Sequence, residues 1–231
     1  MKRASFLFAA AFVIFASLGQ TGTEAIVPSH ADRFVGAAAE GAAGTYNFDR
    51  AHTVIGFRVK HNGLIDIPGF FRDFSGAVNY DPKEMTKSSV EFTAKATSID
   101  TGNTGRDTHL RSKDFFEVDK FVDVAFKSTK VEQKGKQWMV TGDFTMKGVT
   151  KSITFPFNIT GFLPASERSG GRMGITAETM IKRSDYGITY GQNIVGTSTP
   201  VIADEVHIHL AIEAPMPRAT APAATATPAV K

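Results

Sequence analysis

The segment from residue 138 to residue 159, WMVTGDFTMKGVTKSITFPFNI, decides the fold of this chain. Apolar residues recur at every second position in two runs, 138–146 and 153–159, and the turn-like sequence KGVTK separates the runs. Such alternation places successive side chains on opposite faces of a β-strand. The segment therefore predicts two neighbouring strands joined as a hairpin, each with one apolar face.

Six further segments alternate in the same way. They cover residues 55–61, 74–79, 90–97, 122–128, 175–182 and 206–213. Together with the first two runs they predict an all-β fold of eight antiparallel strands. The chain has nineteen phenylalanines, and each one on an apolar face buries a large area. One stretch differs, because Asn103 is a favourable N-cap and predicts a short helix that begins near it.

Eight such strands can bury their apolar faces in two ways. A sandwich packs two sheets against each other, whereas a closed barrel buries the faces inside and leaves no free edge. The alternation does not choose between them, nor does it tell whether inward phenylalanines fill the interior or line a cavity. Small residues at inward positions indicate open space. They are Gly76, Ala94, Ala96, Gly142 and Ala177.

The ends of the chain differ in composition from the middle. A basic start, an apolar run over residues 6–18 and small residues up to Ala25 predict a cleaved signal peptide at residues 1–25 and a periplasmic or secreted protein. The alternative is an uncleaved anchor, but the run is shorter than the ~20 residues that a spanning helix needs. Residues 26–44 are expected to form a flexible lead-in, 45–213 the folded domain, and 214–231 a disordered tail of Ala, Pro and Thr.

Composition excludes several classes of protein. The chain has no cysteine, which excludes a disulfide scaffold, and its net charge of +3 is spread along the sequence, which argues against nucleic-acid binding. Nucleophile-elbow, phosphate-loop and zinc-protease motifs are absent, so we expect no enzyme. His207 and His209 have the spacing of a metal-binding pair on one strand face, but no third ligand lies near them in the sequence, so we expect no metal site.

Five spaced motifs give the domain a resemblance to a known family. They are residues 46–57 (YNFDRAHTVIGF) with 59–63 (VKHNG), 69–76 (GFFRDFSG), 98–103 (SIDTGN) with 106–107 (RD) and 109–116 (HLRSKDFF), 142–151 (GDFTMKGVTK), and 183–187 (RSDYG). In this order they closely resemble the YceI-like family of secreted bacterial proteins. The resemblance covers residues 45–213.

The resemblance implies a fold and a ligand. It implies an eight-stranded antiparallel lipocalin-like barrel with an elongated apolar cavity, which the short helix covers at one end. The implied ligand is a long-chain isoprenoid lipid, such as a quinone tail or a prenyl alcohol or phosphate, with no other cofactor. The implied role is carriage or storage in the periplasm, tied to respiration or envelope stress, with transient contact to a membrane or to a lipid donor or acceptor.

Alternation and resemblance together predict the site residues. The expected cavity wall consists of Phe57, Val59, Phe74, Phe92, Phe126, Phe144, Phe155, Phe157 and Ile181. The expected headgroup or entrance residues are His61, Arg106, Asp107, His109, Arg183 and Asp185. Arg183 and Asp185 share the parity of Ile181 and are expected on the inner face, as a headgroup contact or as a structural ion pair.

Two other functions stay open on the sequence. One is a stress-response interaction module with a filled core and a partner bound to its outer surface. The other is a weak hydrolase or isomerase that acts on a lipid inside the cavity.

Overall fold

The computed structural model describes residues 41–166 and 170–216 of the chain. They form one antiparallel sheet of eleven strands with one α-helix and three short 3₁₀ helices. The strands are β1 (Gly44–Asn47), β2 (Val54–His61), β3 (Ile65–Phe71), β4 (Phe74–Tyr80), β5 (Ser89–Lys95), β6 (Ile99–Asp100), β7 (Asp123–Lys134), β8 (Gln137–Met146), β9 (Val149–Leu163), β10 (Arg172–Lys182) and β11 (Ile202–Pro215). The helices are α1 (Thr104–Arg111), η2 (Met85–Lys87), η3 (Ala96–Ser98) and η4 (Arg183–Tyr186).

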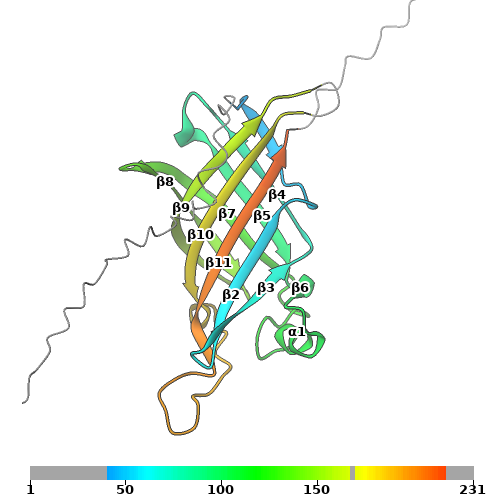
Figure 1. The fold of residues 1–231 in the computed structure, drawn as a ribbon, viewed down its shortest axis with the longest axis vertical. Coiled ribbons are helices and arrows are strands. Elements are labelled where there is room, and N and C mark those ends of the chain that lie inside the picture. Colours follow the sequence, from blue (N-terminus) through cyan, green and yellow to red (C-terminus); the bar gives the residue numbers. More distant parts are fainter. Residues whose placement is uncertain (1–40, 167–169, 217–231) are drawn as a thin grey trace, which may run out of the picture. The chain divides into compact units, whose positions relative to one another are not determined.

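The sheet follows the order β1-β4-β5-β7-β8-β9-β10-β11-β2-β3-β6, and every neighbouring pair is antiparallel. It curls so that the strands surround a common interior, which confirms the expected lipocalin-like barrel (Figure 1). The inner face is apolar because alternate residues of each strand point inward. Ile55, Val78, Phe92, Phe155 and Leu210 are among its buried side chains.

All eight expected strands are present, but the count of eight is wrong for the described residues. The additional strands are β1, β3 and β6. β1 and β6 have four and two residues, too few to display a period. β3 contains Pro68 and Gly69, which interrupt the composition typical of a strand.

Some element boundaries differ from the expected ones. β5 ends at Lys95, and its expected continuation forms η3. Val122 precedes β7 and is half exposed. β11 continues to Pro215, two residues into the expected tail. The expected signal peptide, residues 26–40 of the lead-in and residues 217–231 of the tail lie outside the described residues.

Helix α1 begins where the sequence predicts. The Asn103 side chain accepts a hydrogen bond from the backbone N–H of Arg106 at 3.0 Å, which is the contact of an N-cap. The helix lies at one end of the sheet, beside β6 and β3 (Figure 1). No helix among the described residues is both long and apolar enough to cross a bilayer.

Candidate ligand cavity

Two of the cavities found among the described residues lie inside the curled sheet. The larger has a volume of about 390 Å³ and lies at the end that carries α1, between the sheet, the helix and the segment that follows η4. The smaller has a volume of about 60 Å³ and lies further along the strands. Small-molecule sites typically occupy ~300–1,000 Å³, so the larger cavity is the candidate site. Its size disfavours the alternative of a completely filled core.

The expected wall residues divide between the two cavities. Phe57, Val59, Phe144 and Ile181 line the larger cavity. Phe92, Phe126, Phe155 and Phe157 line the smaller cavity. Phe74 is buried in the core and lines neither of these cavities.

The two cavities share no lining residue, which corrects the expectation of one elongated cavity. Of the small inward residues expected to leave open space, Ala177 lines the smaller cavity, but phenylalanine rings fill the space beside Gly76 and Gly142. A Cβ at Gly142 would lie 2.5 Å from the Cζ of Phe126, and a Cβ at Gly76 would lie 2.6 Å from the Cε2 of Phe48. These glycines therefore admit rings of the protein itself rather than a ligand.

The polar side chains that line the larger cavity are all basic or neutral. They are Lys60, His61, Thr101, Arg106, His109 and Arg183. No carboxylate lines this cavity, although two of the basic groups have one nearby. Lys60 pairs with Asp66 at 2.9 Å, and the Nε2 of His109 lies 3.0 Å from Asp114.

Arg106 is held at the cavity by Thr101. Its Nε donates to the Thr101 hydroxyl at 2.7 Å, and its Nη2 donates to the Thr101 carbonyl at 2.8 Å. Arg106 itself makes no ion pair among the described residues. Asp107 is buried and accepts hydrogen bonds from the backbone N–H and the hydroxyl of Thr101. Asp107 therefore positions Thr101 rather than lining the cavity.

Arg183 reaches the cavity. Of the two expected arrangements, pairing with Asp185 or with other groups near the cavity entrance, the pairing with Asp185 is wrong. β10 ends at Lys182, and the 3₁₀ turn that follows breaks the strand parity. Asp185 lies 3.2 Å from Lys151 on the exterior. Arg183 instead donates to four backbone carbonyls at 2.7–3.1 Å, and its partial burial lowers its pKa. The carbonyls belong to Ile188, Tyr190, Ile202 and Ala203.

Comparison with known proteins identifies the family. Residues 46–214 match the YceI-like domain. The chain belongs to the YceI-like family. It is 37% identical over 152 residues to a UPF0312 protein of Photorhabdus laumondii, and this alignment covers 64% of the chain and 78% of the relative. It is also 37% identical over 154 residues to Protein YceI of Escherichia coli, and this alignment covers 65% of the chain and 80% of the relative.

Several solved structures share the fold. Burkholderia cenocepacia BcnA superposes with a TM-score of 0.61 at 25% identity, over 72% of this chain and 98% of BcnA. A Campylobacter jejuni YceI protein superposes with a TM-score of 0.57 at 29% identity, over 74% of this chain and 96% of the other. A polyisoprenoid-binding domain from Saccharophagus degradans gives a TM-score of 0.57 at 17% identity, over 76% of this chain and all of that domain, a likeness of fold alone.

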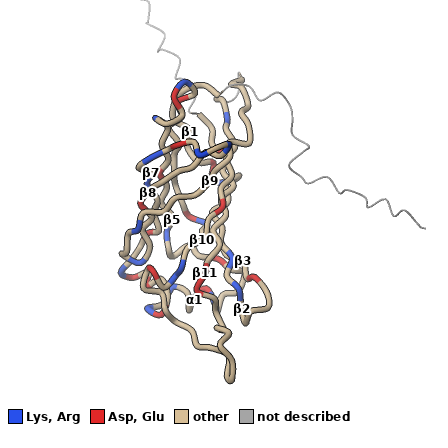
Figure 2. Tube along the Cα trace, turned by 90° about the vertical axis from the view of Figure 1, so that its left-hand side faces the viewer, with Lys and Arg blue, Asp and Glu red and all other residues tan. Residues whose placement is uncertain are grey.

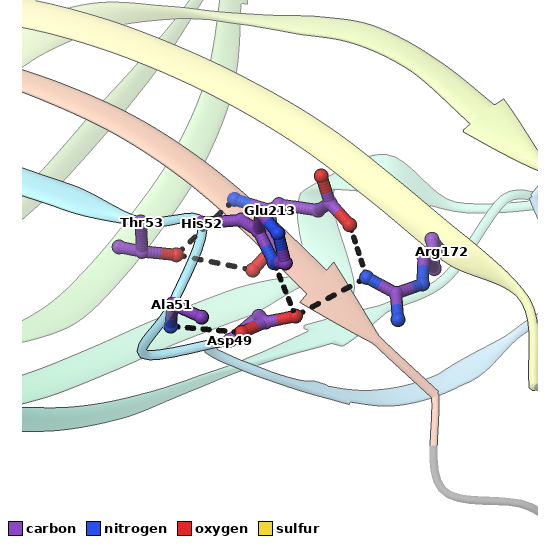
Figure 3. A network of polar contacts seen from close by, with 6 residues as sticks. All are labelled: Asp49, Ala51, His52, Thr53, Arg172 and Glu213. Carbon is purple, nitrogen blue, oxygen red and sulfur yellow. Dashed lines mark hydrogen bonds and ion pairs between the residues drawn. The ribbon is translucent and has the colours of Figure 1, made fainter.

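This YceI-like chain also has a polar cluster that the sequence did not predict (Figure 3). Arg172, at the start of β10, forms an ion pair with Glu213 of β11. It also forms an ion pair with Asp49 of the β1–β2 loop, with 3.2 Å between the Arg172 Nη1 and the Asp49 Oδ2. The Nδ1 of His52 lies 3.0 Å from the same Asp49 carboxylate. The Thr53 hydroxyl donates to the Glu213 carbonyl at 3.1 Å. We call these residues the clasp, because they tie the β1–β2 loop to two long strands.

The ionisable groups of the clasp shift one another's pKa values. The hydrogen bond with His52 lowers the pKa of Asp49, and the same bond raises the pKa of His52. Ligand-type atoms of Asp49, His52 and Glu213 lie within 4.8 Å of one another, a spacing that can hold a metal ion. Arg172 already pairs with both carboxylates, however, so the chemistry of this cluster is that of an ion-pair network.

Proposed function

We propose that this protein binds a long-chain isoprenoid lipid in the larger cavity and carries or stores it in the periplasm. The observation that carries the proposal is the cavity itself, about 390 Å³ with apolar walls and polar groups along part of its lining. The polyisoprenoid-binding description of the S. degradans domain, which shares the fold, supports the choice of ligand class. The signal-like sequence of residues 1–25 supports the periplasmic location.

Apolar burial alone supplies a large driving force for such a ligand. Each buried methylene contributes about 0.8 kcal/mol. Ten apolar carbons therefore give a gross gain of about 8 kcal/mol, before the costs of association and ordering. Binding of this kind needs no catalytic group and no metal ion.

The polar lining favours an anionic headgroup. Lys60, His61, Arg106, His109 and Arg183 contribute positive or protonatable groups, and no carboxylate opposes them on the cavity wall. A phosphate accepts charge-assisted hydrogen bonds from such groups, whereas an alcohol gains less from them. We therefore propose a prenyl phosphate as the preferred ligand over a prenyl alcohol or a quinone.

Arg106 is the residue that we assign to the headgroup. Lys60 and His109 each have a carboxylate partner, and Arg183 is engaged with four carbonyls. Arg106 is exposed, lines the cavity and is oriented by Thr101. It can therefore meet a phosphate without first giving up an ion pair.

The test has two parts. Native mass spectrometry of protein isolated from its own periplasm, followed by lipid extraction, should reveal a bound prenyl chain. Titration with a prenyl phosphate and with the prenyl alcohol of equal length should give tighter binding of the phosphate, and Arg106→Gln should weaken phosphate binding by about tenfold without changing alcohol binding. The control is Arg58→Gln on the outer face of β2, which should change neither. Protein that is isolated empty and takes up no prenyl compound would contradict the proposed function.

A further inference from the structure

One end of the described domain carries a segment without charge. No charged residue occurs from residue 186 to residue 203, although 21% of the whole chain is charged. This segment contains the loop between η4 and β11, which projects at the lower end of Figure 1 and bears neither blue nor red in Figure 2. The adjacent β2–β3 turn with the first residue of β3, together residues 62–65, is also uncharged. We call the loop 187–201 and the turn 62–65 together the uncharged rim.

Large apolar side chains stand exposed at the tips of this rim. Leu64 and Ile65 of the turn are 78% and 59% exposed, and Val195 of the loop is 98% exposed. A solitary exposed apolar residue is ordinary, but three on adjacent tips call for a partner that shields them.

The loop holds its tip by its own hydrogen bonds. The N–H of Ile194 donates to the carbonyl of Thr199 at 2.8 Å, and the N–H of Thr197 donates to the carbonyl of Ile194 at 2.9 Å. Gly196 supplies the left-handed conformation that the turn needs, with φ of 78°. Val195 therefore lies at the tip of a turn that these two backbone hydrogen bonds hold in place.

The two segments of the rim are joined to each other and to the cavity. The N–H of Asn62 donates to the carbonyl of Val201 at 2.9 Å. Tyr190 packs edge-to-face on His109, with ring centroids 4.8 Å apart, which ties the loop to α1. His61 and Ile202 line the larger cavity and lie directly beside the rim in sequence. The exposed tips thus flank the end of the cavity.

We propose that the uncharged rim docks on the surface of a lipid bilayer, so that a ligand passes between the bilayer and the larger cavity without crossing water. This inference rests on the proposed function and names the partner from which the lipid comes. The absence of charge favours a bilayer over a protein partner. The rim combines exposed apolar side chains with uncharged Thr, Ser, Asn and Gln side chains, and this mixture suits the polar–apolar boundary of a membrane. The nearby cations Lys60 and Arg106 suit anionic lipid headgroups.

Vesicle flotation tests the docking directly. Purified protein is mixed with vesicles of phosphatidylethanolamine and phosphatidylglycerol, and the floating fraction is measured. Wild-type protein should float, and Leu64→Asp and Val195→Asp should each reduce the partition coefficient by about tenfold, since a buried aliphatic side chain is replaced by a charge. The matched control is Leu163→Asp, which changes a 63% exposed leucine at the end of β9 remote from the rim and should float like wild type.

Fluorescence gives a second readout that does not depend on loss of binding. Trp138 is the only tryptophan of the chain, so Trp138→Phe with Val195→Trp places a single fluorophore at the loop tip. Its emission should shift to the blue on addition of vesicles and should be quenched by brominated acyl chains. A fluorophore that stays solvent-exposed in the presence of vesicles overturns the inference, as does wild-type protein that does not float.

Two further measurements separate this inference from the function on which it rests. Uptake of a prenyl phosphate from a cyclodextrin carrier should be unchanged in the rim variants, whereas uptake from vesicles should be slowed. Wild-type protein that takes up the carrier-delivered ligand but ignores vesicles refutes the docking and leaves the proposed function intact. Failure of both uptake routes refutes the proposed function. Sedimentation is also compared between wild-type protein and Val195→Asp. A wild-type dimer that is lost in Val195→Asp would show that the rim binds a second copy of the chain, and it would overturn the inference of bilayer docking.

Discussion

The ring of Phe126 occupies the space into which a side chain at Gly142 would project. A Cβ at residue 142 would lie 2.5 Å from the Cζ of Phe126 and 2.5 Å from the carbonyl oxygen of Lys127. Phe126 lines the smaller cavity, and its cross-strand partner Phe144 lines the larger. We therefore predict that the Phe126 ring is part of the partition between the two cavities and limits how far a bound ligand would extend along the barrel.

Phe126→Ala should open this partition. Removal of the ring should join the space of about 390 Å³ to that of about 60 Å³, so the variant should bind longer prenyl chains than wild type. The loss of a buried aromatic side chain should also lower the free energy of unfolding by about 3–5 kcal/mol. Titration with prenyl phosphates of increasing length, together with urea denaturation, measures both effects.

Phe74→Ala is the control for this change. Phe74 is as buried as Phe126 but lines neither cavity, so its truncation should destabilise the fold by a similar amount. It should not alter the preferred chain length. An equal shift in chain length for both variants would mean that general loosening, and not the partition, sets the limit.

Gly142→Ala tests the same contact from the other side. The added methyl group meets a backbone carbonyl as well as the Phe126 ring, so it cannot be accommodated by a side-chain rotation alone. We expect overpacking to lower the free energy of unfolding by about 1–3 kcal/mol. The control is Gly105→Ala in α1, where an added Cβ meets only the Asn103 Oδ1 at 3.5 Å. That change should stabilise the helix, by at most about 1 kcal/mol, and loss of stability in both variants would contradict the explanation.

The sequence predicted the long strands because alternation is a local property. The eight segments with period two all form strands, and the N-cap at Asn103 starts α1 as expected. β3 was missed because Pro68 and Gly69 hide a strand that tertiary pairing with β2 stabilises. Parity failed at Asp185 because it applies only while a strand continues, and β10 ends at Lys182.

The interior could be predicted less well than the sheet. Small inward residues mark where space exists beside the backbone, but a ring from a neighbouring segment can enter that space, as Phe48, directly after β1, does at Gly76. The clasp was beyond the reach of pattern reasoning, because Asp49 and Arg172 are 123 positions apart. Their proximity follows from the sheet order and not from any local period.

Arg183→Met should release the loop of the uncharged rim. Arg183 donates to carbonyls of Ile188, Tyr190 and Ile202, and methionine keeps the aliphatic stem while leaving these acceptors without their donor. Hydrogen exchange across residues 187–203 should accelerate by about tenfold or more, since charged hydrogen bonds of this kind fix local stability. Exchange measured by mass spectrometry checks this, with Arg58→Met on the outer face as the control. Unchanged exchange in Arg183→Met would show that the loop is fixed by other contacts.

The clasp should make stability depend on pH from mildly acidic to alkaline conditions. The Asp49 carboxylate raises the pKa of His52 above its ordinary value of 6.5, so protonated His52 stabilises the folded state. This contribution is complete below the ordinary pKa and is lost as pH rises through the raised one. The lowered pKa of Asp49 acts at the other end, since its contribution is present above the ordinary value of 3.8 and is lost as pH falls through the lowered one.

Melting temperatures of His52→Ala and wild type should therefore converge as pH rises. At about pH 5, where the imidazolium is fully formed, the variant should melt below wild type, and at about pH 9 the difference should shrink because wild-type His52 has lost its proton. The control is His207→Ala, which removes an imidazole that makes no ion pair within the described residues. The difference in melting temperature between this variant and wild type should stay constant across the same pH range. A His52→Ala deficit that stays constant with pH would assign the effect to lost packing instead of the ion pair with Asp49.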